Sequence, residues 1–263
     1  MERFLTGRRA LVIGGSGGIG AEVSVALARA GADLVIHGGT SVERLDRTAG
    51  RARDAGGPDA RDTDAATPES TRARPGVETI LLAFDPCRLD EQCGELLSRA
   101  GRVDIFVCSF GPYVESPIHD MTADGWRRMI DLNLTLPALV IGRLLPGMRE
   151  RRFGRIVLFG GPRSDRIEGY RSIGAYAAAK TGLASLTRSV ARQSAGYGIT
   201  CNMIAPGYVE TEYYDEQRAR AIAAARPTGR MVKPEEIGYH VLHLLSRSSD
   251  SVNGAVFPVD FGE

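Results

Sequence analysis

The chain opens with a short apolar stretch, a glycine-rich turn and an amphipathic stretch, and this order of elements restricts the fold strongly. Residues 9–13 (Arg-Ala-Leu-Val-Ile) are typical of a buried strand. Glycines follow at once between Gly14 and Gly20, and residues 21–30 have helical periodicity. Such a turn lets the backbone approach a pyrophosphate, while the helix N-terminus offers free N–H groups and the positive end of a dipole. The opening of the chain therefore predicts a dinucleotide-binding unit.

The glycines of this turn fit two spacings known from nucleotide-binding proteins. Gly15, Gly17 and Gly20 match G-x-G-x-x-G, and Gly14, Gly18 and Gly20 match G-x-x-x-G-x-G. A glycine-rich turn without a ligand is the competing interpretation, but the strand before it and the helix after it favour a cofactor site. The residues expected to contact the cofactor here are Gly14, Ser16, Gly17, Gly18, Ile19 and Gly20.

The end of the second predicted strand, residues 33–37, bears on the choice of cofactor. Sites that prefer NAD usually end this strand with an acidic residue that binds the ribose 2′-OH. Here Gly38, Gly39 and Thr40 follow, and none of them would repel a 2′-phosphate. The nearby groups that could donate to such a phosphate are Thr40, Ser41, His37 and Arg44, although Arg44 could equally lie on the helix surface. The sequence therefore favours NADP(H) over NAD(H).

Strands and helices alternate through the rest of the chain. Further strands are predicted at residues 77–84, 103–108, 155–159, 199–204 and 255–259, and helices at 42–55, 88–100, within 121–147, at 176–195 and at 234–246. This alternation predicts an α/β fold, a Rossmann-like doubly wound parallel sheet of about seven strands with right-handed crossovers. No linker divides residues 1–263, so we expect a single dinucleotide-binding and catalytic domain.

Two segments do not fit the alternation. Residues 56–76 are polar and rich in proline and glycine, so they cannot bury a core face, and we expect a surface insertion there. Residues 208–230 are polar and rich in tyrosine, which is typical of a lid over a substrate pocket. Together with Pro112 and Tyr113, residues 208–226 are expected to line the substrate pocket.

The composition excludes several classes of protein. A net charge of +1 over 263 residues gives no basic surface for nucleic acid, and the apolar runs are shorter than a membrane span. The N-terminus leads almost at once into a strand, so we expect no signal peptide and a cytoplasmic location. The four cysteines form no C-x-x-C pair and are expected to be reduced, and the four histidines suggest no metal site.

A second constraint comes from a tyrosine and a lysine four residues apart, Tyr176 and Lys180, on a predicted helix. That spacing places both side chains on one helix face. A nearby ammonium lowers the pKa of a phenol, which could then exchange a proton with an alcohol or carbonyl oxygen. Of the 33 basic residues only Lys180 and Lys233 are lysines. The competing interpretation is an exposed lysine beside a tyrosine that packs in the core.

These features occur together with others that are typical of one family. The matching residues are the glycine turn, Asp85, Asn133, Tyr176, Lys180, and the segments 202–211, 229–237 and 254–260. Along nearly its whole length the chain resembles the short-chain dehydrogenase/reductases, and in general pattern the 3-oxoacyl-carrier-protein reductases.

The resemblance implies reversible hydride transfer between NADP(H) and a carbonyl or secondary alcohol substrate. It implies that Tyr176 exchanges the proton, that Lys180 holds the nicotinamide ribose, and that Asn133 orders a proton-relay water. It also implies a homotetramer or homodimer. The further cofactor contacts expected from it are Gly38, Gly39, Thr40, Asp85, Pro86, Ser109, Gly111, Pro206, Gly207, Val209 and Thr211.

Two departures from the family pattern stand out. The family's Asn-Asn-Ala-Gly after the fourth strand is here Cys108-Ser109-Phe110-Gly111. The family's catalytic serine falls on Gly161 when counted from the fifth strand and on Arg163 when counted back from Tyr176. Ser164 is the nearest hydroxyl, so either a shifted loop delivers Ser164 or no serine acts. These departures motivate a second hypothesis, a nucleotide-binding sensor or scaffold with little catalysis.

Overall fold

The sheet that the sequence predicts is present and is entirely parallel. The computed structural model describes residues 3–57 and 76–262, and in this part of the chain seven strands lie in the order β3-β2-β1-β4-β5-β6-β7. Their bounds are β1 (Arg9–Ile13), β2 (Asp33–Gly38), β3 (Val77–Leu81), β4 (Ile105–Cys108), β5 (Gly154–Phe159), β6 (Ile199–Pro206) and β7 (Val256–Val259). The central strands are apolar on both faces because helices cover both sides of the sheet.

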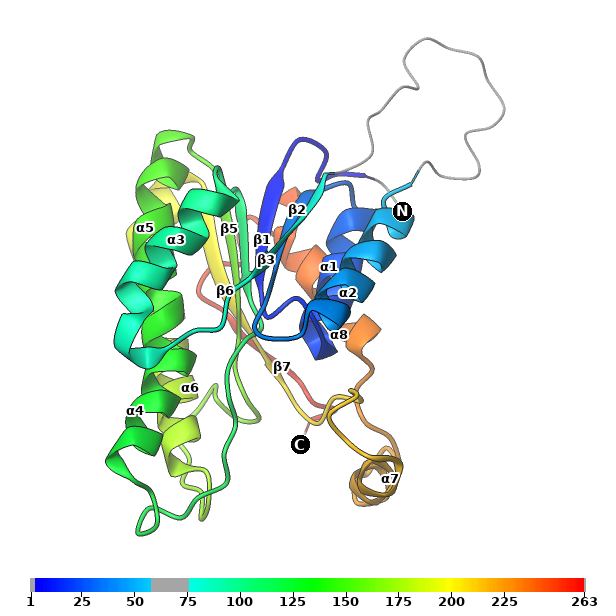
Figure 1. Ribbon diagram of the computed structural model, residues 1–263, viewed down its shortest axis with the longest axis vertical. Helices are drawn as coiled ribbons and strands as arrows, with labels where there is room; N and C mark the ends of the chain where they lie inside the picture. Colours follow the sequence, from blue (N-terminus) through cyan, green and yellow to red (C-terminus); the bar gives the residue numbers. More distant parts are fainter. Residues whose placement is uncertain (1–2, 58–75, 263) are drawn as a thin grey trace.

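Helices form a layer on each face of this sheet (Figure 1). One layer holds α1 (Gly18–Arg29), α2 (Val42–Ala55) and α8 (Pro234–Leu245), and the other holds α3 (Leu89–Ala100), α4 (Ala123–Ile130), α5 (Leu136–Glu150) and α6 (Gly174–Ser194). Each layer packs on the sheet through its own apolar cluster. The remaining helix, α7 (Glu216–Ala224), extends from the carboxyl end of the sheet.

The strand order fixes where a ligand can bind. β1 pairs with β2 on one side and with β4 on the other, so the order of the chain reverses at β1. In open parallel sheets ligands bind beside this reversal, at the carboxyl ends of the strands. The register pairs Ile13 with Cys108, so the glycine turn after β1 and the turn after β4 lie side by side.

Most element bounds agree with the sequence prediction, and the differences have local causes. β3 ends at Leu81 rather than at residue 84, and a short 3₁₀ segment, Pro86–Arg88, follows it. The polar lid segment contains helix α7, which begins where the Asp215 carboxylate accepts a hydrogen bond from the Arg218 amide (2.7 Å). Of the predicted insertion at 56–76, residues 58–75 lie outside the described residues.

One continuous helical run, Ala123–Glu150, is long and apolar enough to cross a membrane by length and composition alone. It comprises α4, a π-helical segment (Asp131–Thr135) and α5. Half of its most apolar stretch is buried inside the protein, where it packs against α3 and α6. This packing explains the apolar composition, which is that of a helix in the protein core.

Candidate active site

The glycine turn after β1 has the backbone geometry that its sequence predicts. Gly14 and Gly18 have φ of +82° and +52°, which residues with a side chain rarely adopt. A Cβ built on Gly20 would lie 2.1 Å from the Gly14 carbonyl oxygen, so only glycine lets α1 begin this close to the turn. Gly17 starts α1 without a side-chain cap. The first turn of α1 is therefore not capped by the side chain of its own N-cap residue, and its amides can bind an anionic group from elsewhere.

The altered turn after β4 is held against the glycine turn by a hydroxyl group. Ser109 Oγ donates to the Ile13 carbonyl (3.0 Å) and lies 3.3 Å from the Gly14 carbonyl oxygen. The Phe110 backbone packs closely against Gly14. A Cβ built on Gly14 would lie only 2.8 Å from the Phe110 amide nitrogen. Ser109 and Phe110 thus fix the position of Gly14 although the family's asparagines are absent.

His37 has a structural role, so the expectation that it could donate to a 2′-phosphate is wrong. Its ring is fully buried and stacks on Phe84 at 4.8 Å between ring centroids. Nδ1 lies 3.4 Å from the Gly14 amide, and Nε2 lies 2.7 Å from the Leu82 carbonyl oxygen. Burial lowers the pKa of His37 to about 4, so the ring is neutral at pH 7.

This buried histidine predicts a loss of stability in mild acid. The unfolded chain binds a proton at His37 below about pH 6.5, whereas the folded protein binds it only below about pH 4. The free energy of unfolding should therefore fall as the pH drops through this window, by about 3 kcal/mol for this residue. His37→Gln should flatten that slope in denaturant melts between pH 7 and 4. The exposed His119→Gln is the control, and an unchanged slope in His37→Gln would contradict the assignment.

The remaining groups expected near the adenosine lie on two elements. The Ser41 hydroxyl caps α2 by accepting from the Arg44 amide (3.2 Å), and Thr40 is exposed beside it. The Arg44 side chain extends toward the glycine turn, where a Cβ on Gly17 would lie 2.4 Å from its guanidinium. Asp85 is exposed beyond β3, and its carboxylate accepts from the Cys87 amide (2.9 Å) in the turn begun by Pro86.

Asn133 and Lys180, expected to act with Tyr176, meet around Gly111. A Cβ on Gly111 would lie 2.2 Å from Asn133 Oδ1 and 3.1 Å from Lys180 Nζ. Asn133 is buried in the π-helical segment, where Nδ2 donates to the Met129 and Pro112 carbonyls (3.0 Å each). Its Oδ1 is buried without a hydrogen-bond partner. A buried acceptor left open in this way is costly unless a donor outside the protein satisfies it.

The tyrosine and lysine lie on one face of α6, as their spacing predicts. Lys180 is buried, and its ammonium donates to the Phe159 carbonyl at the end of β5 (2.9 Å) and lies 5.7 Å from the Tyr176 ring centroid. Tyr113 packs edge-on against Tyr176, with 5.2 Å between the ring centroids.

The expected direction of the tyrosine pKa is wrong for this arrangement. Burial raises the pKa of Tyr176 above its ordinary value, and the neighbouring tyrosine hydroxyls add to the effect. Burial also lowers the pKa of Lys180 to about 8. The Lys180 ammonium donates to the Phe159 carbonyl rather than to the phenol, and burial is the largest cause of the raised pKa of Tyr176. Tyr176 is therefore a neutral phenol at pH 7.

The loop between β5 and α6 brings Gly161 to the tyrosine hydroxyl. A Cβ on Gly161 would lie 2.8 Å from Tyr176 Oη, so the phenol lies directly against this backbone. Ser164 is buried, and its hydroxyl is bonded to the Gly161 amide (2.9 Å) and carbonyl (2.5 Å). Of the two positions expected for the family's serine, the loop brings Gly161 against the Tyr176 hydroxyl, and Ser164 is hydrogen-bonded to Gly161.

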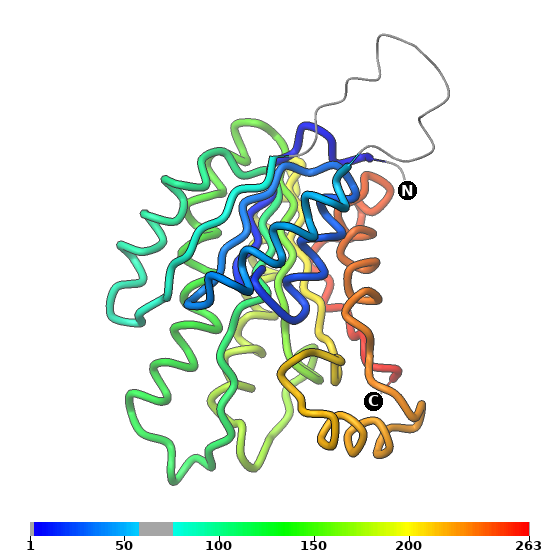
Figure 2. Tube along the Cα trace, turned by 45° about the vertical axis from the view of Figure 1, so that its right-hand side comes forward, coloured from blue at the N-terminus to red at the C-terminus, as the bar shows by residue number. Residues whose placement is uncertain are grey.

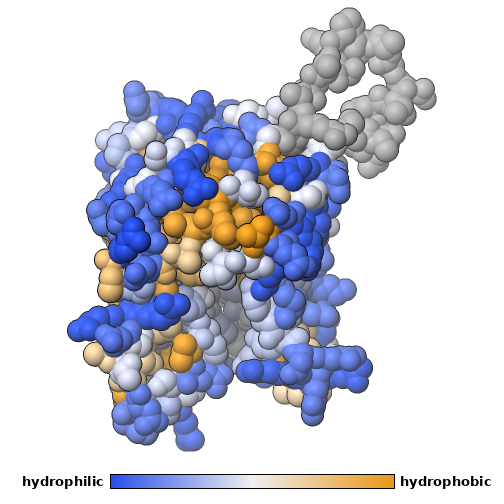
Figure 3. Space-filling model, in the orientation of Figure 1, coloured by the Kyte–Doolittle hydropathy of each residue, from blue (hydrophilic) through white to orange (hydrophobic). Residues whose placement is uncertain are grey.

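The segment after β6 returns to the glycine turn. Pro206 ends the strand, the Gly207 amide donates to the Val259 carbonyl (3.0 Å), and Val209 pairs with Val232. Thr211 lies beside the start of α1. A Cβ built on Gly18 would lie 3.6 Å from the Thr211 methyl carbon. Figure 2 shows this segment, in gold, next to the turn that follows β1. In Figure 3 the surface is hollowed between the part of the molecule that contains the segment after β6 and the part that contains α4 and α6.

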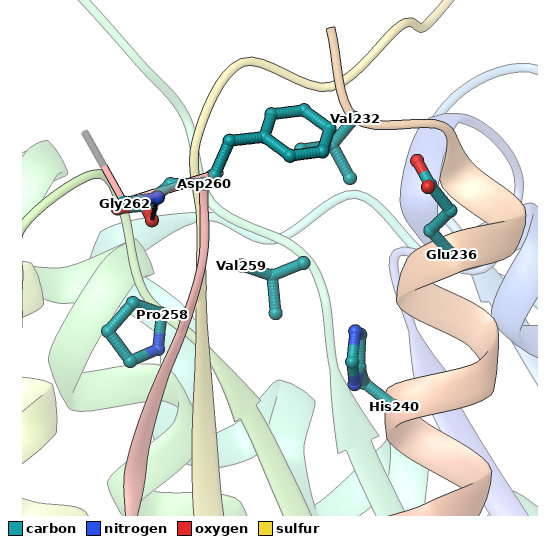
Figure 4. Close-up of a pocket in the computed structure, with 8 residues that line it drawn as sticks. Val232, Glu236, His240, Pro258, Val259, Asp260 and Gly262 are labelled. Atoms are coloured by element: carbon teal, nitrogen blue, oxygen red, sulfur yellow. Dashed lines mark hydrogen bonds between the residues drawn. The ribbon is translucent and has the colours of Figure 1, made fainter. Parts of the chain in front are cut away.

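A separate pocket lies between α8 and β7 (Figure 4). Its lining includes His240, Glu236 and Asp260. The Glu236 carboxylate is already paired with Arg230 through two hydrogen bonds (2.8 and 2.9 Å). Among the described residues, no group of three His, Cys, Asp or Glu side chains is arranged to hold a metal ion.

Two contacts of the site could not be predicted from the sequence. The contact of Gly161 with Tyr176 could not, because counting the loop from its two ends gave different positions. The other contact is that of Glu212, whose carboxylate binds the Gly18 amide. The only signal for Glu212 was its position directly after Thr211, in a segment expected near the cofactor.

The chain is similar to known proteins along nearly its whole length. Residues 85–263 match the family described as enoyl-(acyl carrier protein) reductase. The chain is 34% identical to the cis-4-hydroxycyclohexanecarboxylate dehydrogenase of Sinomonas cyclohexanicum over 97% of this chain and 96% of the relative.

Two solved structures cover almost the whole chain. A short-chain dehydrogenase/reductase family protein superposes with a TM-score of 0.80 at 30% identity, covering 99% of this chain and 97% of the other. A 3-oxoacyl (acyl-carrier-protein) reductase from Agrobacterium tumefaciens C58 with NADP bound gives 0.82 at 25% identity, covering 97% and 94%.

The fold and site define an oxidoreductase that transfers hydride between a nicotinamide cofactor and an alcohol or ketone carbon. The chain belongs to the short-chain dehydrogenase/reductase family. The residues present fit such a cofactor. Gly14 and Gly18 have positive φ and Gly20 has no room for a Cβ, so the turn requires glycine at these positions. A carboxylate, that of Glu212, already accepts from the Gly18 amide, as an anionic cofactor group would.

Proposed function

We propose that this protein is an NADP(H)-dependent ketoreductase that uses Tyr176 as its proton donor and acceptor. One observation carries the proposal: Tyr176, Lys180 and Asn133 meet at the carboxyl edge of the sheet, beside the turn after β4 and next to the glycine turn. Bound nicotinamide would supply or accept the hydride.

The chain's own residues would hold the cofactor and manage the proton. The glycine turn from Gly14 to Gly20 and Thr211 would hold the pyrophosphate, and Ser109 and Gly111 the region near the nicotinamide. Lys180, buried beside Tyr176, would bind ribose hydroxyls with its ammonium. The remaining proposed contacts are Ser16, Ile19, Gly38, Gly39, Thr40, Asp85, Pro86, Pro206, Gly207 and Val209.

The protonation of Tyr176 suits the reducing direction. Because burial raises its pKa, the phenol is protonated at neutral pH and can donate to a carbonyl oxygen as hydride arrives at the carbon. The open Oδ1 of Asn133 is an acceptor for the water that would return a proton. Lys180, whose pKa burial lowers to about 8, would still carry its charge at pH 7.

Ser164 enters the proposal through the backbone of Gly161. Its hydroxyl accepts from the Gly161 amide and donates to the Gly161 carbonyl, so it is committed to the loop. This favours the alternative in which no serine hydroxyl touches the substrate directly. We therefore propose Ser164 as a positioning residue that fixes Gly161 against the Tyr176 hydroxyl.

Arg44 is the group that would select NADP(H). Its guanidinium lies at the glycine turn, and residues 39–42, directly after β2, include no acidic residue. Arg44→Gln should weaken NADPH binding about tenfold, because a charged hydrogen bond contributes about 1.5–3 kcal/mol, and should change NADH binding little. Fluorescence titration with both cofactors measures this. Arg47→Gln, one turn further along α2, is the control, and equal weakening for NADPH and NADH would contradict the role.

A sensor or scaffold with the same fold is the second candidate function, motivated by the changed turn at Cys108–Gly111 and by the glycine at 161. NADPH oxidation over a panel of ketones, quinones and acyl thioesters distinguishes the two. Turnover of any carbonyl compound supports the reductase. Tight binding of NADPH without turnover of any panel member supports the sensor.

We further propose a cytoplasmic homotetramer or homodimer that acts on a small carbonyl or alcohol compound. The long helices α5 and α6 offer the surfaces through which such an assembly would form. Sedimentation velocity tests the assembly, and a monomer at micromolar concentration would contradict it. This proposal includes neither a nucleic-acid nor a membrane partner, because the net charge of +1 attracts neither.

A further inference from the structure

The lid is tied to the glycine turn by a carboxylate. Both oxygens of Glu212 accept from the Gly18 amide, at 3.0 and 3.2 Å. The same carboxylate forms an ion pair with Arg44, whose guanidinium also lies 5.0 Å from the centroid of the Tyr213 ring. Burial alone would raise the pKa of Glu212, but the hydrogen bonds, including those from the Gly18 amide and Arg44, outweigh burial. The pKa is therefore lowered, and the carboxylate is ionised at neutral pH.

Glu212 and Tyr213 occupy the surface that a pyrophosphate would need. A Cβ on Gly17 would lie 2.6 Å from Glu212 Oε1, and a Cβ on Gly18 would lie 2.9 Å from the Tyr213 ring. A carboxylate at the start of α1 satisfies the amide and the helix dipole in the way a phosphate oxygen would. Two anions cannot share the one Gly18 N–H, and the contact distances leave no room for both groups.

We propose that Glu212 is an internal competitor for the cofactor, a latch that closes the lid over the empty glycine turn and opens when the cofactor phosphates take its place. This inference rests on the proposed function. Opening releases Arg44 from its ion pair with Glu212, so the same exchange makes the guanidinium available to the adenosine 2′-phosphate. The latch thus links lid position to cofactor binding through Arg44.

The latch has a measurable consequence for affinity. When only a fraction of a protein is in the binding-competent state, its apparent affinity for the ligand is reduced to that fraction of the intrinsic affinity. If the closed state holds about nine-tenths of the free protein, removing the latch should tighten cofactor binding about tenfold. A group that held the cofactor would show the reverse, because its loss would weaken binding.

The test compares Glu212→Gln with the wild type and with Glu210→Gln in NADPH titrations by fluorescence or calorimetry. Glu210 is an exposed carboxylate two residues earlier, so its variant matches the change in net charge. The latch predicts about tenfold tighter binding in Glu212→Gln and little change in Glu210→Gln. Equal or weaker binding in Glu212→Gln would overturn the latch while leaving the proposed function intact. Absence of NADPH and NADH binding in all three proteins would overturn both.

A second measurement follows the lid in the cofactor-free protein. Helix α7 carries the exposed Arg218 and Arg220, after which trypsin cleaves. Without the Glu212 contacts the lid should open more often, so cleavage in α7 should be faster in Glu212→Gln than in Glu210→Gln. Equal cleavage rates would contradict the latch.

Discussion

Tyr176→Phe should lower the turnover of carbonyl substrates about 10²–10⁴-fold, which is the contribution of a positioned proton donor. The variant loses one oxygen atom from a neutral phenol, so the ring keeps its packing against Tyr113 and Gly161. Binding of NADPH should stay close to that of the wild type, because the glycine turn is untouched. Stopped-flow or steady-state NADPH oxidation, together with a binding titration, measures both quantities.

Tyr197→Phe is the matched control, since Tyr197 lies in the 3₁₀ turn that follows α6 and is 40% exposed. It should retain wild-type turnover. Full activity in Tyr176→Phe would remove the proton-transfer role from this residue. Loss of NADPH binding in the same variant would show that the phenol serves the cofactor site rather than the proton.

Gly20→Ala should destabilise the protein and disable its nucleotide turn. The added Cβ would lie 2.1 Å from the Gly14 carbonyl oxygen and 2.4 Å from Ser109 Oγ, and a backbone carbonyl cannot rotate away as a side chain would. We expect a loss of about 2–3 kcal/mol in the free energy of unfolding, typical of an overpacked core. NADPH affinity should fall at least tenfold, by about 1.4 kcal/mol or more, because the turn must shift. Chemical denaturation and cofactor titration measure the two effects.

Gly50→Ala makes the same chemical change inside α2, where nothing lies within 4 Å of the added methyl group. It should stabilise the protein by about 0.5–1 kcal/mol, since alanine restricts the unfolded chain and favours the helix. A Gly20→Ala protein with wild-type stability and affinity would show that α1 does not need its close approach to the turn.

The fold was predictable from the sequence because each element had a local signal. Alternating apolar runs and amphipathic stretches indicated seven strands and the helices between them, and α2 was predicted with its observed bounds, Val42–Ala55. Helix α7 was not predicted, because its short polar sequence buries no residue and resembles a loop. Its helix is instead defined by the Asp215 cap.

The candidate site was only partly predictable. The i,i+4 spacing placed Tyr176 and Lys180 on one face of α6, but the pKa direction depended on burial, which spacing does not reveal. His37 looked like a phosphate ligand and is a buried structural residue, because β2 lies inside the sheet. The contact between Glu212 and Gly18 joins residues 194 positions apart, so only the folded chain brings them together.

The most direct test of the account follows the hydride. NADPH carrying deuterium at both C4 positions is incubated with the wild-type protein and the carbonyl panel, and the alcohol products are analysed by mass spectrometry and NMR. We expect one deuterium on the carbinol carbon of a product, and none in the Tyr176→Phe reaction over the same time. A protein that binds NADPH yet transfers deuterium to no carbonyl carbon would contradict the assignment of this site as a reductase centre.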